Sequence, residues 1–397
     1  MFRALTFAVR TLLRQPGRSA VGILGIAAVG ALLFDMLLLS RGLVVSFRQL
    51  LDGVGFDVRV MAGEIGPIGG QKLPRANSIA RELAALPEID EIVPLRLADA
   101  ETASGPSSTG FSIMGADSRS RRLWTIVAGA DLDRGAAAQL VINKRLAATA
   151  NVSPGDSLNV RVTCVSDRAA PSPVPFTVRG IATFPFETAT ELTAVTSRAS
   201  LMSACGGDTD DADLLLVASR EGYGPDAAVA AIRRIRPDLV PATNEEIVAR
   251  MQQQGFSYFR QISTVLSTIT MLFGFLLITV LLTVSVNQRL AEIAALRALG
   301  FSRRRVIEDV FWQSALLVGV GGVLALPLGA AMSVWLDRIL KTMPGIPTSM
   351  HFFVFEPRAL VLHLVLLAAT AVLAAAYPMR LVSALPIAAT LRNEVVG

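Results

Sequence analysis

The sequence predicts an α+β membrane protein, with four transmembrane helices and a large α+β extracytoplasmic domain between the first helix and the second. Three observations predict this class. Four apolar runs are each close to the roughly 20 residues that a helix needs to cross a hydrocarbon core. Charged residues make up 17% of the 397 residues and hydrophobic residues 52%, whereas soluble domains carry about 25% charged residues. Residues 41–261 are of mixed composition and separate the first run from the second.

The predicted segments follow in chain order. Phe2, Leu5, Val9 and Leu12 recur at helical spacing with arginines between them, which is typical of a helix lying at a membrane surface. The first apolar run is too long for the core of a signal peptide, and no A-x-A-like site follows it, so we expect a retained anchor. The segments are a cytoplasmic amphipathic helix at 1–18, transmembrane helix 1 at 19–40, the extracytoplasmic domain at 41–261, transmembrane helix 2 at 262–287, a cytoplasmic coupling region at 288–310, transmembrane helix 3 at 311–336, an extracytoplasmic loop at 337–359, transmembrane helix 4 at 360–378 and a cytoplasmic tail at 379–397.

Arginines gather in three segments that flank the apolar runs, and this bias predicts that those segments are cytoplasmic. They precede the first run, lie between the second and third, and follow the fourth: Arg3, Arg10, Arg14 and Arg18; Arg289, Arg297 and Arg303–Arg305; Arg380 and Arg392. Both termini are then cytoplasmic, and residues 41–261 lie outside with 23 Lys and Arg against 25 Asp and Glu. The pI of 9.7 therefore reports membrane topology, and we expect no basic stripe for nucleic acid.

The outer domain is predicted to contain a duplicated β-α-β module. At its start, 56–61, 78–86 and 92–95 have the patterns of a strand, a helix and a strand, and at its end 213–217, 225–235 and 239–240 repeat that order. The residues between these units, about 97–210, are rich in Gly, Pro and Ser and contain short strand patterns at 139–143, 157–162 and 176–182. We interpret them as a β-rich insert.

No catalytic, cofactor or metal site is expected in this chain. None of the three lysines follows a glycine, so the Walker A motif is missing. The two histidines and two cysteines lack zinc-ligand spacing, and the acidic cluster at 208–213 lacks the order of a calcium loop, which favours a solvated loop. Cys164 and Cys205 would pair in an oxidising compartment, worth roughly 2–4 kcal/mol; two buried free thiols are the alternative.

Two ionisable residues lie inside the apolar runs. Asp35 is near the outer end of the first run and Arg41 follows it, which favours interfacial snorkelling or pairing over a role in transport. His363 lies in the fourth run, where a hydrogen bond across helices is favoured over a proton relay.

The segment QRLAEIAALRALGFSRRR, at 288–305, predicts a short helix that places Ile293 and Leu296 on one apolar face. Gly300 suits the position after such a helix. The apolar face is too short to span a membrane, so it must be buried against a soluble partner or rest on lipid, and the pattern alone leaves both open.

This segment resembles the coupling-helix signature of ABC transporter permeases of the MacB/FtsX/LolC-LolE type. The matching residues are Arg289, Glu292, Ile293, Leu296, Arg297, Ala298, Leu299 and Gly300. Tyr377-Pro378, Leu385-Pro386-Ile387 and Leu391-Arg392 are similar to the family's C-terminal ending, and 140–156 and 176–181 resemble the β-rich insert of the MacB-type outer domain. The order of one span, a large outer domain and three spans matches as well, so the resemblance covers the whole chain.

The resemblance implies the membrane subunit of a bacterial ABC transporter, in the inner (plasma) membrane with the large domain in the periplasm. The subunit would form a homodimer, or a heterodimer with a similar permease, and bind separate ABC ATPase subunits through 291–300. ATP and Mg would sit on those ATPases, because the ATPase domain fused to MacB is missing from this sequence. A periplasmic adaptor or carrier protein is a further possible partner, and no nucleic acid is expected.

The work implied is export or extraction of a periplasmic or membrane-derived substrate by ATP-driven motion, with no catalysis in this chain. The main alternative is an FtsX-like signalling or scaffold subunit that controls a periplasmic partner without transport. A membrane-anchored sensor without an ATPase and a secondary transporter are further alternatives.

Overall fold

The computed structural model describes residues 9–10, 12–14, 16–63, 71–103, 108–117, 121, 123–133, 135–136, 138–164, 172–206, 210–254, 257–287, 302–343, 346–355 and 357–383. They divide into two compact units. The first, the helical unit, comprises residues 1–43, 256–338 and 351–397, and the second, the domain unit, comprises 44–255 and 339–350.

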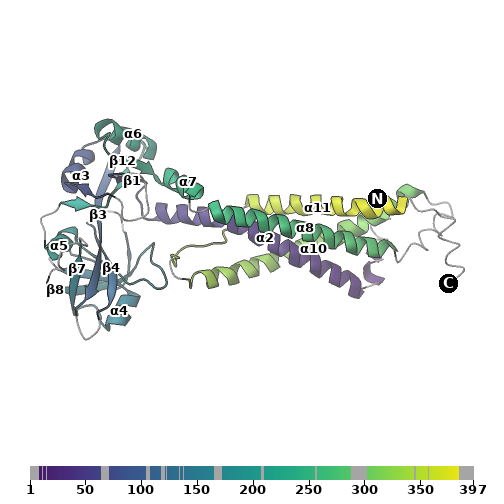
Figure 1. Ribbon diagram of the computed structural model, residues 1–397, viewed down its shortest axis with the longest axis horizontal. Coiled ribbons are helices and arrows are strands. Elements are labelled where there is room, and N and C mark those ends of the chain that lie inside the picture. Colours follow the sequence, from purple (N-terminus) through teal and green to yellow (C-terminus); the bar gives the residue numbers. More distant parts are fainter. Residues whose placement is uncertain are drawn as a thin grey trace. The chain divides into compact units, whose positions relative to one another are not determined.

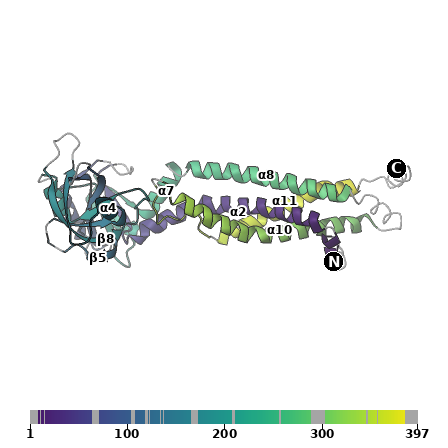
Figure 2. The ribbon, with the colours of Figure 1, turned by 90° about the horizontal axis from the view of Figure 1, so that it is seen from below.

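Four long helices build the helical unit, and Figures 1 and 2 show them running side by side. They are α2 (Pro16–Gly53), α8 (Ser257–Asn287), α10 (Arg303–Leu340) and α11 (Pro357–Ser383). Each contains a stretch long and apolar enough to cross a membrane: Ser19–Gly53, Gln261–Leu281, Phe311–Leu340 and Pro357–Ala374. The prediction of four such helices, with the large domain between the first and the second, is confirmed.

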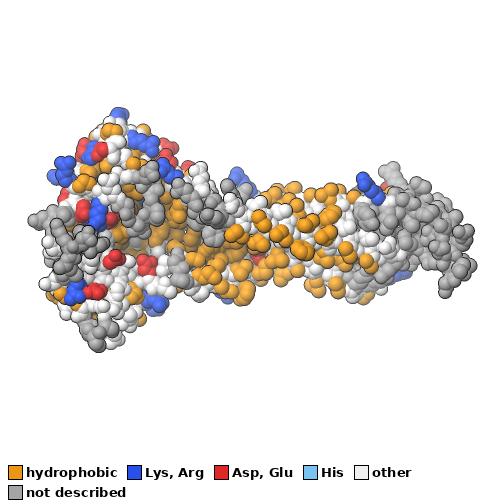
Figure 3. Space-filling model, in the orientation of Figure 1, with side chains coloured by type: hydrophobic (Ala, Val, Ile, Leu, Met, Phe, Trp, Pro, Cys, Tyr) orange, Lys and Arg blue, Asp and Glu red, His pale blue; other side chains and the backbone are white. Residues whose placement is uncertain are grey.

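Apolar side chains cover the outside of these helices, as the space-filling view in Figure 3 shows. On α8, Ile262, Val265, Leu272 and Phe273 are each more than half exposed. Exposing so much apolar surface to water would be unfavourable for a soluble bundle, whereas contact with lipid tails is favourable. Charged side chains instead gather on the domain unit in the same view.

The first half of the domain is a split β-α-β module. Its elements are β1 (Val58–Met61), α3 (Ala76–Ala84), β3 (Ile89–Thr102), β11 (Leu214–Ser219), α6 (Pro225–Ile235) and β12 (Val240–Thr243). The strands lie in the order β12-β1-β11-β3 and pair antiparallel. The two predicted β-α-β units are therefore present but interleaved, because each has a strand of the other between its own two strands.

Both faces of this small sheet are buried. Val217 on one face packs with Leu83 of α3 and Ile232 of α6. Leu216, pointing to the other face by strand alternation, packs with Val141 and other residues of the second half. The two halves of the domain consequently share one apolar core.

The second half is a closed barrel, where the sequence predicted a β-rich insert. Its elements are β4 (Gly110–Gly115), β5 (Thr125–Gly129), β6 (Gln139–Asn143), α4 (Lys144–Ala150), β7 (Ser157–Thr163), β8 (Val174–Thr183), β9 (Thr193–Thr196) and α5 (Arg198–Ala204). The strands β3, β4, β9, β6, β8 and β7 pair in that order, and β7 returns to β3. The strand β5 pairs with β8, and apolar side chains such as Phe176 and Ile142 fill the interior.

Two short strands, β2 (Leu73–Pro74) and β10 (Asp211–Ala212), pair beside the module, and α7 (Asn244–Gln254) follows β12. One strand, β3, connects the two halves because its first residues pair with β11 and its last residues with β4 and β7. Continuous backbone hydrogen bonding along β3 therefore makes the halves one stiff body.

Candidate functional site

The residues predicted to couple to an ATPase lie outside the described residues: Arg289, Glu292, Ile293, Leu296, Arg297, Ala298, Leu299 and Gly300. The helix α8 ends at Asn287 before them, and α10 begins at Arg303 after them. Of the predicted helix at 1–18, residues 9–10, 12–14 and 16–18 are described, and all of them are helical.

Small residues bring α10 close to α2. They occur at every fourth position of α10: Gly321, Ala325, Gly329 and Ser333. A Cβ atom added at Gly321 would lie 2.7 Å from Cγ2 of Ile26, and one added at Gly329 would lie 3.1 Å from Cδ1 of Phe34. Such spacing lets helix backbones approach and pack tightly where lipid supplies no hydrophobic driving force between helices. We call this contact the α2–α10 seam.

Asp35 lies at the end of the α2–α10 seam and is 0% exposed. Its Oδ1 accepts a hydrogen bond from the Ser333 hydroxyl. The seam encloses the side chain, so the expected snorkelling is wrong, whereas the pairing expected as its alternative takes the form of this hydrogen bond with Ser333. Nothing is described of the Arg41 side chain. The neighbouring residue Met36 ties α2 to α8, since its carbonyl oxygen accepts from Oγ of Ser263 at 2.8 Å.

His363 on α11 is also 0% exposed. Its ring packs against Phe34 with the centroids 5.2 Å apart. Neither ring nitrogen has a hydrogen-bond partner among the residues that the structure describes. The predicted hydrogen bond across helices is therefore wrong for the described residues, and aromatic packing holds the ring instead.

Asn244 joins the outer end of α2 to the domain, and we call this contact the α2 junction. The side-chain amide donates to Oδ1 of Asp52 at 2.8 Å and to the carbonyl oxygen of Phe56 at 3.0 Å, and its Oδ1 accepts from Arg59. Asn244 is only 5% exposed. Burial lowers the pKa of Arg59 to about 10, against the opposing effect of Asp52 and Asp57, so the guanidinium remains charged at neutral pH.

The first turn of α7 is fixed by reciprocal hydrogen bonds. The backbone N–H of Glu246 donates to Oγ1 of Thr243 at 3.1 Å, and the N–H of Thr243 donates to Oε2 of Glu246 at 3.3 Å. This is a capping box, which the sequence Thr-Asn-Glu-Glu at 243–246 signals. Our sequence reasoning did not identify α7 or Asn244, although that motif was available.

Apolar packing supports the α2 junction. Leu51 of α2, Ala242 of β12, and Ile247 and Val248 of α7 form one buried cluster. Each large aliphatic side chain buried from water contributes roughly 1.5–3 kcal/mol. The last ten residues of α2, the N-terminal part of α7 and the strand β12 therefore pack as one unit.

Buried arginines fasten the barrel to the split module. Arg96 is 3% exposed, and its Nη1 donates to both carboxylate oxygens of Asp213, at 3.0 and 2.9 Å. Arg198 pairs with Asp210 and donates to Oδ1 of Asn77 at 2.6 Å. The prediction of a solvated acidic loop is wrong for Asp210, Asp211 and Asp213, each of which pairs with one of these two arginines. Asp208 lies outside the described residues.

The structure joins Cys164, which follows β7, to Cys205, which follows α5, by a disulfide with the Cα atoms 5.7 Å apart. Both residues contact the apolar interior of the barrel. The backbone carbonyl of Cys164 accepts from Nζ of Lys72 at 3.1 Å and from Nη2 of Arg96 at 3.2 Å. Through this carbonyl, Cys164 is hydrogen-bonded to Arg96, one of the arginines that hold the two halves together.

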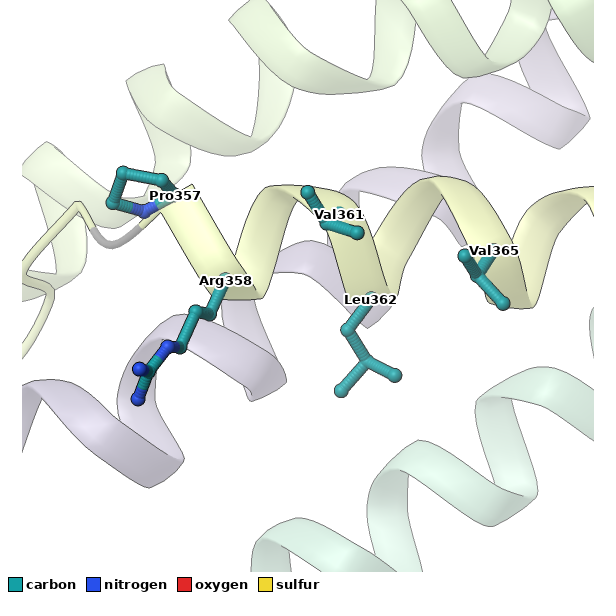
Figure 4. Close-up of a pocket in the computed structure, with 5 residues that line it drawn as sticks. All are labelled: Pro357, Arg358, Val361, Leu362 and Val365. Carbon is teal, nitrogen blue, oxygen red and sulfur yellow. The ribbon is translucent and has the colours of Figure 1, made fainter.

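A shallow apolar groove runs along the first turns of α11, lined by Pro357, Arg358, Val361, Leu362 and Val365. Arg358 and Leu362 project from the same side of the helix in Figure 4. An open groove made by one helix, with a cation at the helix end, is the surface expected of a lipid-facing span.

Within the described parts of the chain, no group of three His, Cys, Asp or Glu side chains could hold a metal ion. The contacts found there hold elements together: the closely packed α2–α10 seam, the hydrogen-bonded α2 junction and the arginine pairs each connect two segments. Such an arrangement can carry a displacement from one segment to another, since packed interfaces respond as units.

Comparisons with known proteins identify two families along the chain. A family described as the MacB-like periplasmic core domain matches residues 19–235, and one described as the FtsX-like permease C-terminal matches residues 264–387. The first match alone spans more than half of the 397 residues. No curated protein matches the chain.

Solved structures resemble the domain at low identity. The periplasmic region of MacB from Actinobacillus actinomycetemcomitans is 14% identical with a TM-score of 0.38, covering 51% of this chain and 95% of that one. The extracellular domain of the noncanonic ABC-type transporter YknZ from Gram-positive bacteria is 11% identical with a TM-score of 0.35, covering 47% and 98%. A domain of a putative permease protein from Porphyromonas gingivalis is 13% identical with a TM-score of 0.32, covering 48% and 90%. These TM-scores lie below 0.5, so the assignment depends on the two family matches.

Proposed function

This chain belongs to the MacB/FtsX-type family of ABC transporter permeases, and on that premise we propose that it transmits ATP-driven motion to its periplasmic domain. The motion would come from separate ATPase subunits, which hold the ATP and Mg. The purpose would be export or extraction of a periplasmic or membrane-derived substrate. Both termini and the segment at 288–310 would face the cytoplasm.

One observation carries the proposal: α2 is a single helix from Pro16 to Gly53. At 1.5 Å per residue its 38 residues extend about 57 Å, well beyond a hydrocarbon core of about 30 Å. Its residues up to Leu43 belong to the helical unit and those from Val44 to the domain unit. We expect a tilt or shift of its membrane part to pass along the helix to the α2 junction.

Residues 291–300 would receive the motion by binding the ATPase, as the family resemblance implies. The chain would act as a homodimer, or as a heterodimer with a similar permease, so that two ATPases close against each other. A periplasmic adaptor or carrier protein would then respond to the domain. The family assignment and the resemblance at Glu292 and Leu296 support this arrangement.

Co-purification tests the ATPase contact. A cytosolic ATPase should purify with the full chain, and Leu296→Asp should release it because a charge would enter the apolar contact. Ala295→Ser is the matched control, since it lies on the opposite face of the predicted helix and should retain the ATPase. Equal retention by both variants would refute the assigned contact.

Accessibility labelling tests the topology. A cysteine placed at Tyr223, which is 51% exposed in the domain, should react in intact cells with a maleimide that cannot cross the inner membrane. One placed at Ala295 should react only after the membrane is opened. Labelling of position 295 from the periplasm would overturn the orientation and the proposed ATPase contact.

The FtsX-like match over residues 264–387 supports a second candidate, a signalling or scaffold subunit that controls a periplasmic partner. The mechanics would be the same, and the difference is the output. If ATP-dependent binding of a periplasmic partner persists while no substrate is moved by the reconstituted complex, the signalling candidate holds and the transport candidate fails.

A further inference from the structure

The last two residues of α10 and the ten residues that follow belong to the domain unit, although the rest of α10 and all of α11 belong to the helical unit. This segment, Ile339–Met350, we call the strap. Its described residues are 339–343 and 346–350. A short loop between two membrane helices is not expected to pack with the domain. The strap does so because it is hydrogen-bonded to it.

The strap is bonded to the connection between β8 and β9, Phe184–Glu191, which we call the receiving loop. Pro347 forms an antiparallel β-bridge with Thr188. The backbone N–H of Thr348 donates to the carbonyl oxygen of Glu187 at 2.8 Å, and its hydroxyl donates to the same oxygen at 3.2 Å. The hydroxyl of Ser349 donates to the carbonyl oxygen of Pro185.

The receiving loop is in turn fixed to the barrel. Oε1 of Glu187 accepts from Nδ2 of Asn143 at 2.8 Å, and the same Nδ2 donates to the carbonyl oxygen of Glu191 at 2.9 Å. Asn143 is 0% exposed and ends β6, and its Oδ1 accepts from the N–H of Leu146 in the first turn of α4. An unbroken series of hydrogen bonds therefore leads from the strap into the barrel interior.

The residues that flank the strap are held within the helical unit. Asp337, near the end of α10, accepts from the backbone N–H of Phe352 at 2.8 Å. The Phe352 carbonyl oxygen lies so close to α2 that a Cβ atom added at Gly42 would clash with it. The residues on both sides of the strap are thus anchored to membrane helices, and the strap itself to the barrel.

We propose that the strap is a second transmission element, which carries movement of α10 and α11 into the barrel through Glu187 and Asn143. This inference rests on the proposed function, since it needs motion to carry. It differs from the α2 junction in its target: the junction acts on the split module at β1 and β12, whereas the strap acts on the barrel at β6 and α4.

Thr348→Pro breaks the contact selectively. Thr348 is the second residue of a turn closed by the hydrogen bond from the N–H of Met350 to the carbonyl oxygen of Pro347, at 3.0 Å. Proline is favoured at that position of a β-turn, so the turn is retained while the N–H that reaches Glu187 is lost. Thr348→Val is the matched control, because it keeps the N–H and removes only the hydroxyl. Ser349→Ala provides a second, milder disruption.

Hydrogen exchange of the full chain with its co-purified ATPase, in lipid nanodiscs, provides two readouts. Without nucleotide, Thr348→Pro should accelerate exchange in the receiving loop by about tenfold, and Thr348→Val by less than about threefold. With ATP and vanadate, wild type and Thr348→Val should show a change in exchange at the first turn of α4. Thr348→Pro should lose this change but keep the one at the α2 junction, and Ser349→Ala should fall between.

Each outcome decides a separate claim. Equal exchange of the receiving loop in all variants would show that the strap contact does not form. Faster exchange of that loop in Thr348→Pro, with the nucleotide response at α4 unaltered, would overturn the strap as a transmission element and leave the proposed function intact. Absence of any nucleotide response in the wild-type complex, at the α2 junction as well as at α4, would overturn both.

Discussion

Replacing Asn244 with Ala should open the α2 junction. The lost amide makes three hydrogen bonds, two of which involve the charged Asp52 and Arg59. A neutral hydrogen bond contributes roughly 1 kcal/mol and one to a charged group roughly 1.5–3 kcal/mol. Asp52 is exposed, so water replaces part of its lost interaction, and the expected net loss is about 3 kcal/mol.

Hydrogen exchange in the full chain measures this loss directly. The reporter is the backbone N–H of residue 244, which donates to the carbonyl oxygen of Asp57 at 2.9 Å. A loss of about 3 kcal/mol corresponds to roughly 150-fold faster exchange through local opening. Asn159→Ala is the control, because Asn159 is an exposed residue of β7 and its replacement should leave the junction unchanged. Acceleration below about threefold in Asn244→Ala would refute the reasoning that this amide holds α2 to the sheet.

Two further predictions concern packing and covalent links. Gly321→Ala should lower the stability of the helical unit by about 1–3 kcal/mol through overpacking, whereas Gly319→Ala should not, because no atom lies within 4 Å of the added Cβ; unfolding of the detergent-solubilised chain in SDS compares them, and equal midpoints would contradict the α2–α10 seam. Replacing Cys164 and Cys205 with Ala should cost about 4 kcal/mol for a loop of 41 residues, measured as the loss of a reductant-sensitive thermal transition; a reductant-insensitive wild type would count against the disulfide.

Local signals in the sequence were sufficient for several elements. The helix predicted at 225–235 is observed with those bounds, since Pro225 fits the first turn and apolar residues recur on one face. The strand predicted at 139–143 also has its predicted bounds. Each depends on residues adjacent in the sequence.

The sequence did not reveal how these elements pair. Interleaving of the two β-α-β units and closure of the barrel through β7 and β3 depend on contacts between residues far apart in the chain, for which hydrophobic alternation carries no register information. The length of α2 was available, however: Leu43, Phe47 and Leu51 recur every four residues beyond the predicted end of the span. The mixed composition there obscured a helix that is apolar on one side only.

In the candidate site, too, some features could be predicted from local sequence and others depend on residues far apart in the chain. The coupling segment at 289–300 stays a prediction from its residues and the family resemblance, because it lies outside the described part. The three bonds of Asn244 join residues separated by 185 to 192 positions, so nothing in the local sequence could identify them. The burial of Asp35 likewise depends on a serine 298 positions away, which a hydropathy pattern cannot show.

A domain attached at two places is restrained against rotation, whereas a domain attached at one place is not. A body fixed to a single helix end can still rotate about that point, and part of any applied movement is lost in the rotation. The α2 junction attaches the split module and the strap attaches the barrel, while β3, the shared apolar core and the Arg96–Asp213 pair hold these halves together. If the proposed function holds, a domain stiffened in this way would convert movement at either attachment into displacement of the whole.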